Sequence, residues 1–153
     1  METIIVIPSR MASTRFPGKP LAKINGKPMI QIVWEQAIFS NLGEVVVACS
    51  ENEVFDLINN LGGKAILTDP NLPSGTDRIY SAILKINQKI KFDYIINLQG
   101  DMPLIKPTQI KKVLEPLIEN FKIGTLATTL KKNEETNPNV TKVFINWNDR
   151  NIG

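Results

Sequence analysis

The chain has 153 residues, of which 42% are hydrophobic and 22% are charged, so it is long enough for one globular domain with a core and too short to expect two. It contains no histidine and one cysteine, which excludes histidine-based catalytic triads, the commonest zinc ligand and a disulfide scaffold. The net charge of +3 is concentrated near the amino end, where residues 1–28 hold five cations and one anion without alternating aromatic residues, a pattern that favours a small polyanion as partner and argues against nucleic acid.

The first predicted element is a strand over residues 3–8, with the sequence TIIVIP. No basic segment precedes this apolar run. Its six residues are also too few for a signal sequence or a membrane span. We therefore expect a cytoplasmic protein with no membrane partner.

Strands and helices alternate along the rest of the chain. Apolar runs rich in β-branched residues predict strands at 44–49, 64–68, 93–98 and 124–130, and helical spacing predicts helices over about 28–40, 51–61, 75–89 and 107–119. Pro28 and Pro107 stand at predicted helix starts, and Gly62 and Gly63 at a predicted helix end. Residues 131–139 predict a polar loop, and residues 140–147 predict an edge strand that we expect to run antiparallel.

This alternation predicts an α/β fold, a doubly wound and mostly parallel sheet with helices on both faces. Cys49 lies in a predicted buried strand, so we interpret it as an inert core thiol. Ligands of such sheets bind beyond the carboxyl ends of the strands. The loops after the strands at 3–8, 64–68 and 93–98 are therefore the first places to search for a site.

The first of these loops, PSRMASTRFPGKP, combines small residues with three cations, Arg10, Arg15 and Lys19. Small residues such as Ser9 and Ser13 let backbone amides approach a ligand, guanidinium groups grip phosphate oxygens in a fork, and an ammonium acts as a movable point charge. The pattern favours a polyphosphate site, with solvated surface cations as the alternative. The loop has neither the GxxxxGK[ST] pattern nor the GxGxxG pattern.

The second loop contains SGTD at residues 74–77. Ser74 and Asp77 fit a helix-capping arrangement, in which the hydroxyl accepts from a backbone amide and the carboxylate reaches back. The same helix start, with Gly75 and Arg78, could also bind an anion or a nucleobase. The two interpretations can hold together.

The third loop, QGDMPLI, places Asp101 just beyond a buried strand. A carboxylate at that position can hold Mg²⁺, which usually takes one or two carboxylates and completes its shell with phosphate oxygens and water. The alternative is a turn residue with no ligand. A cationic loop at the same sheet edge favours the metal.

Together these stretches resemble one family. IPSRMASTRFPGKPLAKINGKPMI, followed by SGTDRI and NLQGDMPLI, closely resembles the 3-deoxy-manno-octulosonate (Kdo) cytidylyltransferases, also called CMP-Kdo synthetases, and NPNVTKV resembles the family's next signature. The resemblance implies a Rossmann-like nucleotide-diphospho-sugar transferase fold. It covers about the first three fifths of the family's length, so we expect a single nucleotidyltransferase-like domain over residues 1–153 that lacks the family's C-terminal segment.

The family's reaction transfers CMP from CTP to Kdo with Mg²⁺ and releases pyrophosphate, in lipopolysaccharide synthesis. By resemblance, Arg10, Arg15 and Lys19 would neutralise the triphosphate, and Asp101 would hold the metal. Groups around Pro8, Ser9, Ser13, Ser74, Gly75 and Arg78 would seat the cytidine, and Gln99 would help to place nucleotide or sugar. Catalysis would rest on Arg10, Lys19 and Asp101.

Three alternatives stay open at this point. The chain could bind CTP without catalysis, could act on a different sugar acid, or could be a non-catalytic protein whose cationic loop docks an acidic partner. The second metal ligand and the sugar-acid pocket would lie in the segment that this chain lacks, and Asp149 and Arg150 are interpreted as a solvated terminus. Exposed apolar surface should then favour a homodimer or self-association.

Overall fold

The computed structural model describes residues 2–12, 16–86 and 91–144. The chain forms two compact units, residues 1–111 and residues 112–153, and each is described by itself. The expectation that both belong to one nucleotidyltransferase domain stays a prediction.

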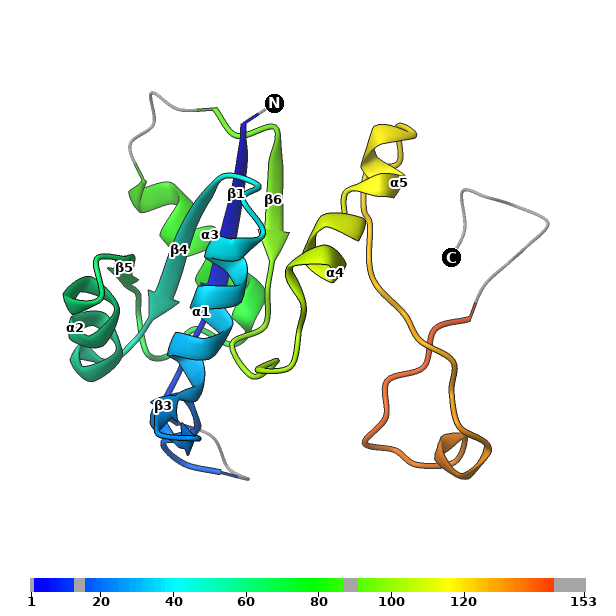
Figure 1. Cartoon of the computed structure of the whole chain (residues 1–153), viewed down its shortest axis with the longest axis horizontal. Helices are drawn as coiled ribbons and strands as arrows, with labels where there is room; N and C mark the ends of the chain where they lie inside the picture. The colour runs from blue at the N-terminus through cyan, green and yellow to red at the C-terminus, as the bar shows by residue number, and fades with distance from the viewer. Residues whose placement is uncertain (1, 13–15, 87–90, 145–153) are drawn as a thin grey trace. The chain divides into compact units, whose positions relative to one another are not determined.

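A four-stranded parallel sheet forms the centre of the first unit. Its strands are β1 (Thr3–Pro8), β4 (Glu44–Cys49), β5 (Lys64–Leu67) and β6 (Tyr94–Asn97), in the order β5-β4-β1-β6 (Figure 1). In the central part of the sheet, Ile5 lies opposite Val45 on one side and Ile96 on the other. These strands confirm the predictions for residues 3–8, 44–49, 64–68 and 93–98.

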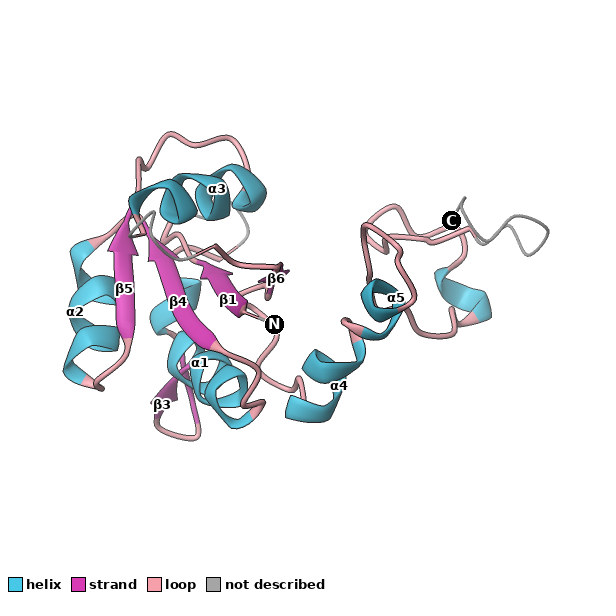
Figure 2. Cartoon of the chain, turned by 90° about the horizontal axis from the view of Figure 1, so that it is seen from above, coloured by secondary structure: helices cyan, strands magenta, loops and turns pink. Residues whose placement is uncertain are grey.

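Helices cover both faces of this sheet, as predicted. α1 (Met29–Phe39) and α2 (Asn52–Asn60) lie on one face and α3 (Gly75–Lys85) lies on the other (Figure 2). Because side chains alternate along a strand, Ile4 and Val6 point to the same face of the sheet, towards α3. There they form a buried hydrophobic cluster with Ile79 and Ala82 of α3. The neighbouring Ile5 is also fully buried and faces the opposite layer.

A short hairpin that the sequence analysis missed follows the first loop. β2 (Lys23–Ile24) pairs antiparallel with β3 (Lys27–Pro28). Between them, Asn25 and Gly26 have φ angles of 48° and 83°, the left-handed pair that a two-residue hairpin turn requires. Pro28 then caps α1, which confirms its predicted place at the helix start.

The predicted helix over residues 107–119 is wrong in its length. The structure has two short helices, α4 (Pro107–Lys112) and α5 (Glu115–Ile118). Pro116 has no N–H to donate to the carbonyl of Lys112, so one continuous helix would lose a hydrogen bond there. Pro107 does begin α4, as predicted.

The second unit contains less regular structure than the sequence suggested. Besides α5, its described residues include the 3-10 helix η2 (Lys132–Glu134) inside the predicted polar loop. Residues 124–130, predicted as a strand, form none, and neither do residues 140–144 of the predicted edge strand; residues 145–147 lie outside the described residues. A strand of β-branched residues such as GTLATTL is stabilised by packing against a neighbouring strand, and residues 124–130 have no strand partner among the described residues.

Candidate functional site

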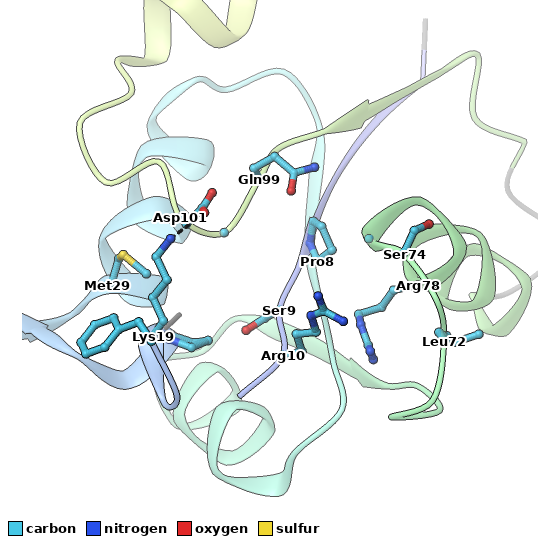
Figure 3. Close-up of a pocket in the computed structure, with 14 residues that line it drawn as sticks. Pro8, Ser9, Arg10, Lys19, Met29, Leu72, Ser74, Arg78, Gln99 and Asp101 are labelled. Carbon is cyan, nitrogen blue, oxygen red and sulfur yellow. Dashed lines mark hydrogen bonds and ion pairs between the residues drawn. The ribbon is translucent and has the colours of Figure 1, made fainter. Parts of the chain in front are cut away.

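One cavity of about 480 Å³ opens at the carboxyl ends of the central strands. It is bounded by the end of β1, the first loop, the start of α3 and the loop after β6 (Figure 3). Its lining consists of Pro8, Ser9, Arg10, Phe16, Lys19, Pro20, Met29, Leu72, Ser74, Gly75, Arg78, Gln99, Gly100 and Asp101. Every predicted site residue in the described part of the chain is in this set. The predicted Ser13 and Arg15, like Asp149 and Arg150, lie outside the described residues.

The first loop is closed at its base, which explains why its two ends reach the same cavity. The Gly18 N–H donates to the Met11 carbonyl at 3.0 Å, so residues 11 and 18 are held together across the loop. Gly18 has a φ of 72°, a conformation that favours glycine, immediately before the 3-10 helix η1 (Lys19–Leu21). Arg10 and Lys19 flank this closed base and both line the cavity.

A hydrogen bond beyond the end of β1 fixes the cavity floor. The Ser9 N–H donates to the Ala48 carbonyl at 2.8 Å, which continues the β1–β4 ladder by one residue. Ser9 is only 5% exposed, and its hydroxyl oxygen is buried with no hydrogen-bond partner in the described part of the chain. Buried polar atoms are normally paired, so this hydroxyl on the cavity wall is available to a ligand.

Two glycines let the neighbouring loops approach β1 closely. A Cβ at Gly100 would lie 2.8 Å from the Pro8 carbonyl oxygen, and a Cβ at Gly75 would lie 3.3 Å from Cγ of Pro8. The loop after β6 and the start of α3 can therefore approach the end of β1 more closely than larger residues would allow. Gly100 was not among the predicted site residues, although a glycine between Gln99 and Asp101 is a sequence feature that could have indicated it.

Arg78 is the most buried charged residue of the cavity, with 2% of its surface exposed. Its Nη1 donates to the hydroxyl of Thr68 and, at 3.2 Å, to the carbonyl of Asp69, whereas its Nη2 is buried and has no hydrogen-bond partner among the residues that the structure describes. Burial lowers the pKa of this guanidinium, Glu51 raises it, and the like charge of Arg10 lowers it.

Arg10 and Arg78 therefore form a cationic end of the cavity (Figure 3). Among the described residues, neither guanidinium has an ion pair with a carboxylate. Two nearby cations, one of them almost fully buried, repel one another and are poorly solvated. A ligand that supplies anionic or carbonyl oxygens would relieve both effects.

Ser74 performs the capping role that the sequence predicted. Its hydroxyl oxygen accepts from the Asp77 N–H at 3.1 Å, and its O–H donates to Oδ2 of Asp77 at 2.5 Å. Ser74 also lines the cavity, so the capping and ligand interpretations are compatible in geometry. The hydroxyl is already engaged, which leaves the backbone of this helix start as its main contribution to a ligand site.

The opposite end of the cavity holds an ion pair. Nζ of Lys19 donates to Oδ2 of Asp101 at 2.7 Å, with side chains 36% and 52% exposed (Figure 3). Nearby, Nε2 of Gln99 donates to Oδ1 of Asn97 at 2.8 Å. Among the described residues, Asp101 is the only carboxylate of the cavity lining, and no group of three His, Cys, Asp or Glu could hold a metal ion.

Sequence reasoning missed the apolar part of the lining. Phe16, Pro20, Met29 and Leu72 contribute carbon surface beside the charged groups. Such residues are ordinary in loops and helices, so the sequence alone did not distinguish them from core or turn residues. The cavity thus combines apolar surface with a few fixed polar groups, as small-molecule sites usually do.

Curated proteins named 3-deoxy-manno-octulosonate cytidylyltransferase are similar to this chain. The relative from Paramagnetospirillum magneticum is 51% identical over 147 residues, which are 95% of this chain and 60% of that protein. The relative from Parvibaculum lavamentivorans is 46% identical over 148 residues, 95% of this chain and 57% of that protein. The chain spans about three fifths of the length of these relatives, and the resemblance predicted from its motifs is confirmed.

Solved structures agree in fold. A CMP:2-keto-3-deoxy-manno-octonic acid synthetase complexed with CTP superimposes with a TM-score of 0.69 and 41% identity, over 78% of this chain and 48% of that one. A cytidylyltransferase from Leptospira borgpetersenii gives a TM-score of 0.66 and 26% identity, over 80% and 51% of the two chains. These likenesses confirm the predicted Rossmann-like α/β fold.

A sequence profile of the family described as cytidylyltransferase matches residues 4–151. The match includes both the strands that build the sheet and all the loops that line the cavity. The similarity extends over nearly the whole chain, and the chain belongs to the cytidylyltransferase family.

Proposed function

We propose that this chain carries the nucleotide-binding part of a Kdo cytidylyltransferase, which transfers CMP from CTP to Kdo and releases pyrophosphate. The observation that carries the proposal is the buried Arg78 guanidinium, whose Nη2 has no hydrogen-bond partner among the described residues, beside Arg10 and in one cavity with Lys19 and Asp101. The names of the relatives and the CTP complex of a similar structure support the choice of nucleotide and acceptor.

The proposed roles follow from the chemistry of each group. Arg10 and Lys19 would neutralise the triphosphate, because they are the more exposed cations at the two ends of the cavity. Arg78, through Nη2, and Ser9, through its hydroxyl, would contact the nucleoside, because these buried atoms have no other partner. Pro8, Gly75 and the helix start at Ser74 would shape the seat, and Gln99 would orient nucleotide or sugar.

The proposed transfer is an in-line displacement at the α-phosphorus. The oxygen of the sugar's anomeric hydroxyl forms a bond to the α-phosphorus and its proton passes to solvent, while the bond from the α-phosphorus to the bridging oxygen breaks and pyrophosphate leaves with that electron pair. Such phosphoryl chemistry asks little covalent work of the protein; positioning and neutralisation of charge supply most of the rate. Fixed cations on the wall of a partly closed cavity are suited to this task.

Asp101 fits a Mg²⁺ site as one protein ligand. Mg²⁺ commonly binds one or two carboxylates and takes its other ligands from phosphates and water, so a single half-exposed carboxylate beside a predicted triphosphate site is sufficient for partial coordination. When bound, the ion would add positive charge at the phosphate oxygens. Asp101 would hold it, and Lys19 and Arg10 would bind the remaining phosphate charge.

We also propose the cellular setting that the family implies, a cytoplasmic step that supplies activated Kdo for lipopolysaccharide. No helix among the described residues is long and apolar enough to cross a membrane.

Self-association or a homodimer stays part of the proposal. On the edge strand β6, Ile95 is 51% exposed, which is the kind of apolar edge that another chain segment can cover.

Nucleotide binding and transfer are tested separately, because the chain spans three fifths of its relatives. We expect CTP with Mg²⁺ to raise the melting temperature, and CTP to act more strongly than UTP, ATP or GTP. Arg10→Met should weaken this response, whereas Lys64→Met, which removes the same charge from a side chain paired with Glu44 at the other end of the strands, should not. No stabilisation by any nucleotide at millimolar concentration would refute the site.

Transfer is measured as pyrophosphate release with CTP and a panel of sugar acids that includes Kdo. Release with Kdo supports the full activity. Nucleotide binding without release supports a CTP-binding chain that does not catalyse transfer alone, and release with another acid would correct the acceptor. If the cationic loop instead binds an acidic protein, CTP should not change the melting temperature.

A further inference from the structure

The ion pair between Lys19 and Asp101 joins two residues that the proposed function assigns to different ligands. The ammonium donates to Oδ2 at 2.7 Å at one end of the cavity, and the bond joins the start of η1 to the loop after β6. The two residues are separated by 82 positions in the sequence, so the fold, and not local chain geometry, brings them together. Neither side chain is fully exposed or fully buried.

The pair places an ammonium against Oδ2 of Asp101, the one carboxylate among the described residues of the cavity lining, where a divalent cation would otherwise bind. A carboxylate oxygen that accepts a short, charge-assisted hydrogen bond from lysine is not free to coordinate a metal ion on that lone pair. Equally, an ammonium held by the carboxylate has less charge to offer a phosphate. Each residue therefore blocks the other's ligand.

We propose that this ion pair is a latch that couples nucleotide binding to metal binding. Resting on the proposed function, the inference is that the triphosphate draws Lys19 away from Asp101 and thereby opens the carboxylate to the metal. The metal alone must compete with Lys19 for Oδ2 of Asp101, and the nucleotide alone gains Lys19 but leaves Asp101 without its partner. Binding both ligands together breaks the pair once and uses both freed groups.

The latch makes binding positively cooperative, and linkage requires the effect to be reciprocal. Whatever factor the nucleotide contributes to metal affinity, the metal contributes to nucleotide affinity. The pair is half-exposed, so its strength is modest, and the coupling it adds should be about two- to five-fold, the range that exposed ion pairs usually support. This is the part that the latch contributes, in addition to direct contact between metal and phosphate.

A double-mutant cycle on metal-free CTP isolates that part. CTP affinity is measured by calorimetry in EDTA for the wild type, Lys19→Met, Asp101→Asn and the double variant. If Asp101 only repels the triphosphate, Asp101→Asn should raise CTP affinity by the same factor in the wild type and in Lys19→Met. The latch predicts that Asp101→Asn raises CTP affinity by a factor about two- to five-fold larger when Lys19 is present, because only then does the substitution free a lysine for the phosphate.

The reciprocal half of the coupling is tested with Mn²⁺ alone, followed by its electron paramagnetic resonance signal. Lys19→Met should bind Mn²⁺ more tightly than the wild type, because it frees Asp101. Arg10→Met is the matched control, since it removes one positive charge from the same cavity and has no bond to Asp101. The latch predicts a larger gain for Lys19→Met than for Arg10→Met; equal gains would show a general field effect and overturn it.

The outcomes separate the latch from the proposed function. A wild type that binds CTP with Mg²⁺, but gives an additive cycle and equal Mn²⁺ gains, keeps the function and refutes the latch. A wild type that binds no nucleotide refutes the proposed function itself. Both substituted side chains are partly exposed, so circular dichroism should show folded variants. If Lys19→Met binds metal-free CTP too weakly to measure, the Mn²⁺ comparison decides.

Discussion

Gly100→Ala perturbs the packing of the cavity without changing its charge. A Cβ at this position would lie 2.8 Å from the Pro8 carbonyl oxygen and 3.2 Å from Cδ1 of Ile30, which is fully buried. Non-bonded carbon atoms are most favourably separated by about 3.5–4.0 Å. The loop after β6 or the end of β1 must therefore move by roughly half an ångström to accept the methyl group.

The size of the effect follows from that crowding. Overpacking a well-packed site costs about 1–3 kcal/mol, and for a chain of this size each kcal/mol lowers the melting temperature by about 2–4 °C. The neighbours of Gly100 in the chain are Gln99 and Asp101, so a shift of the loop also displaces cavity groups. Since errors of about 1 Å in position can cost about 100-fold in rate, we expect CTP binding to weaken by roughly ten-fold.

Gly62→Ala is the matched control for this change. A Cβ there meets nothing within 4 Å, but its φ of 80° is left-handed, so alanine should cost about 1–2 kcal/mol through backbone strain alone. Differential scanning fluorimetry and calorimetric titration with CTP and Mg²⁺ measure both effects. Both variants should lose stability and only Gly100→Ala should lose CTP affinity. Unchanged stability and affinity in Gly100→Ala, or equal CTP losses in both variants, would refute the reasoning.

Three further predictions concern single groups. Ser74→Ala removes the hydroxyl that accepts from the Asp77 N–H, so it should destabilise the chain by about 1 kcal/mol in chemical denaturation, and a Ser74→Asp variant should recover part of the loss. Burial raises the pKa of the Cys49 thiol to about 12, so the folded protein should resist alkylation at pH 8 and react only after unfolding; rapid alkylation of the native protein would contradict its buried position. The hydrogen bond from Lys27 holds the pKa of Glu35 in the folded protein below its ordinary 4.5. This interaction stabilises the native state at pH values above 4.5, and the stabilisation is lost as the pH falls through the lowered pKa of the folded state. Glu35→Gln should therefore cost up to about 1 kcal/mol at pH 7, and a difference from wild type that persisted unchanged at pH 3 would argue against the charge effect.

The strands of the sheet were predictable because burial on both faces leaves a strong pattern. In β1 every residue is buried, and the sequence TIIVIP contains no residue that would favour solvent. Runs of this kind are typical of central parallel strands. The helices between them were found from their spacing, and α2 ends at Asn60, just before the predicted terminating glycine Gly62, whose φ is 80°.

The hairpin and the second unit show two different reasons for missed structure. The turn of the hairpin is marked in the sequence by Asn25 and Gly26, the commonest two-residue hairpin pair, but strands of two residues are too short for an alternating pattern to be recognised. Residues 124–130 give the opposite case, because a strand-like composition needs a partner strand before it becomes a strand. The hairpin thus had a clear turn signal but strands too short to recognise. Residues 124–130 had a clear strand-like composition but no partner strand among the described residues.

The grouping of the predicted site residues could be anticipated from topology alone. Parallel strands end at one edge, so the loops after β1 and β6, which are neighbours in the sheet, must lie side by side. Topology did not indicate which groups would be paired with each other. In the described part of the chain, Lys19 contacts Asp101, and Arg78 keeps one nitrogen without a partner. Both features depend on the directions of side chains, which residue spacing does not predict.

These two features give the ends of the cavity different electrostatic character. At one end Arg10 and Arg78 repel one another, and no carboxylate among the described residues forms an ion pair with either, although Glu51 offsets part of the charge of Arg78, so an anion or a carbonyl oxygen can still bind there. At the other end Lys19 is neutralised by Asp101, so phosphate there must compete with an acid. Under the proposed function, the nucleoside would contact Arg78 at one end, the phosphates would lie between Arg10 and Lys19, and a metal ion would satisfy the carboxylate that the phosphate displaces from lysine. The asymmetry therefore favours a metal–nucleotide complex over a free polyanion, which would leave Asp101 unpaired beside its own negative charge.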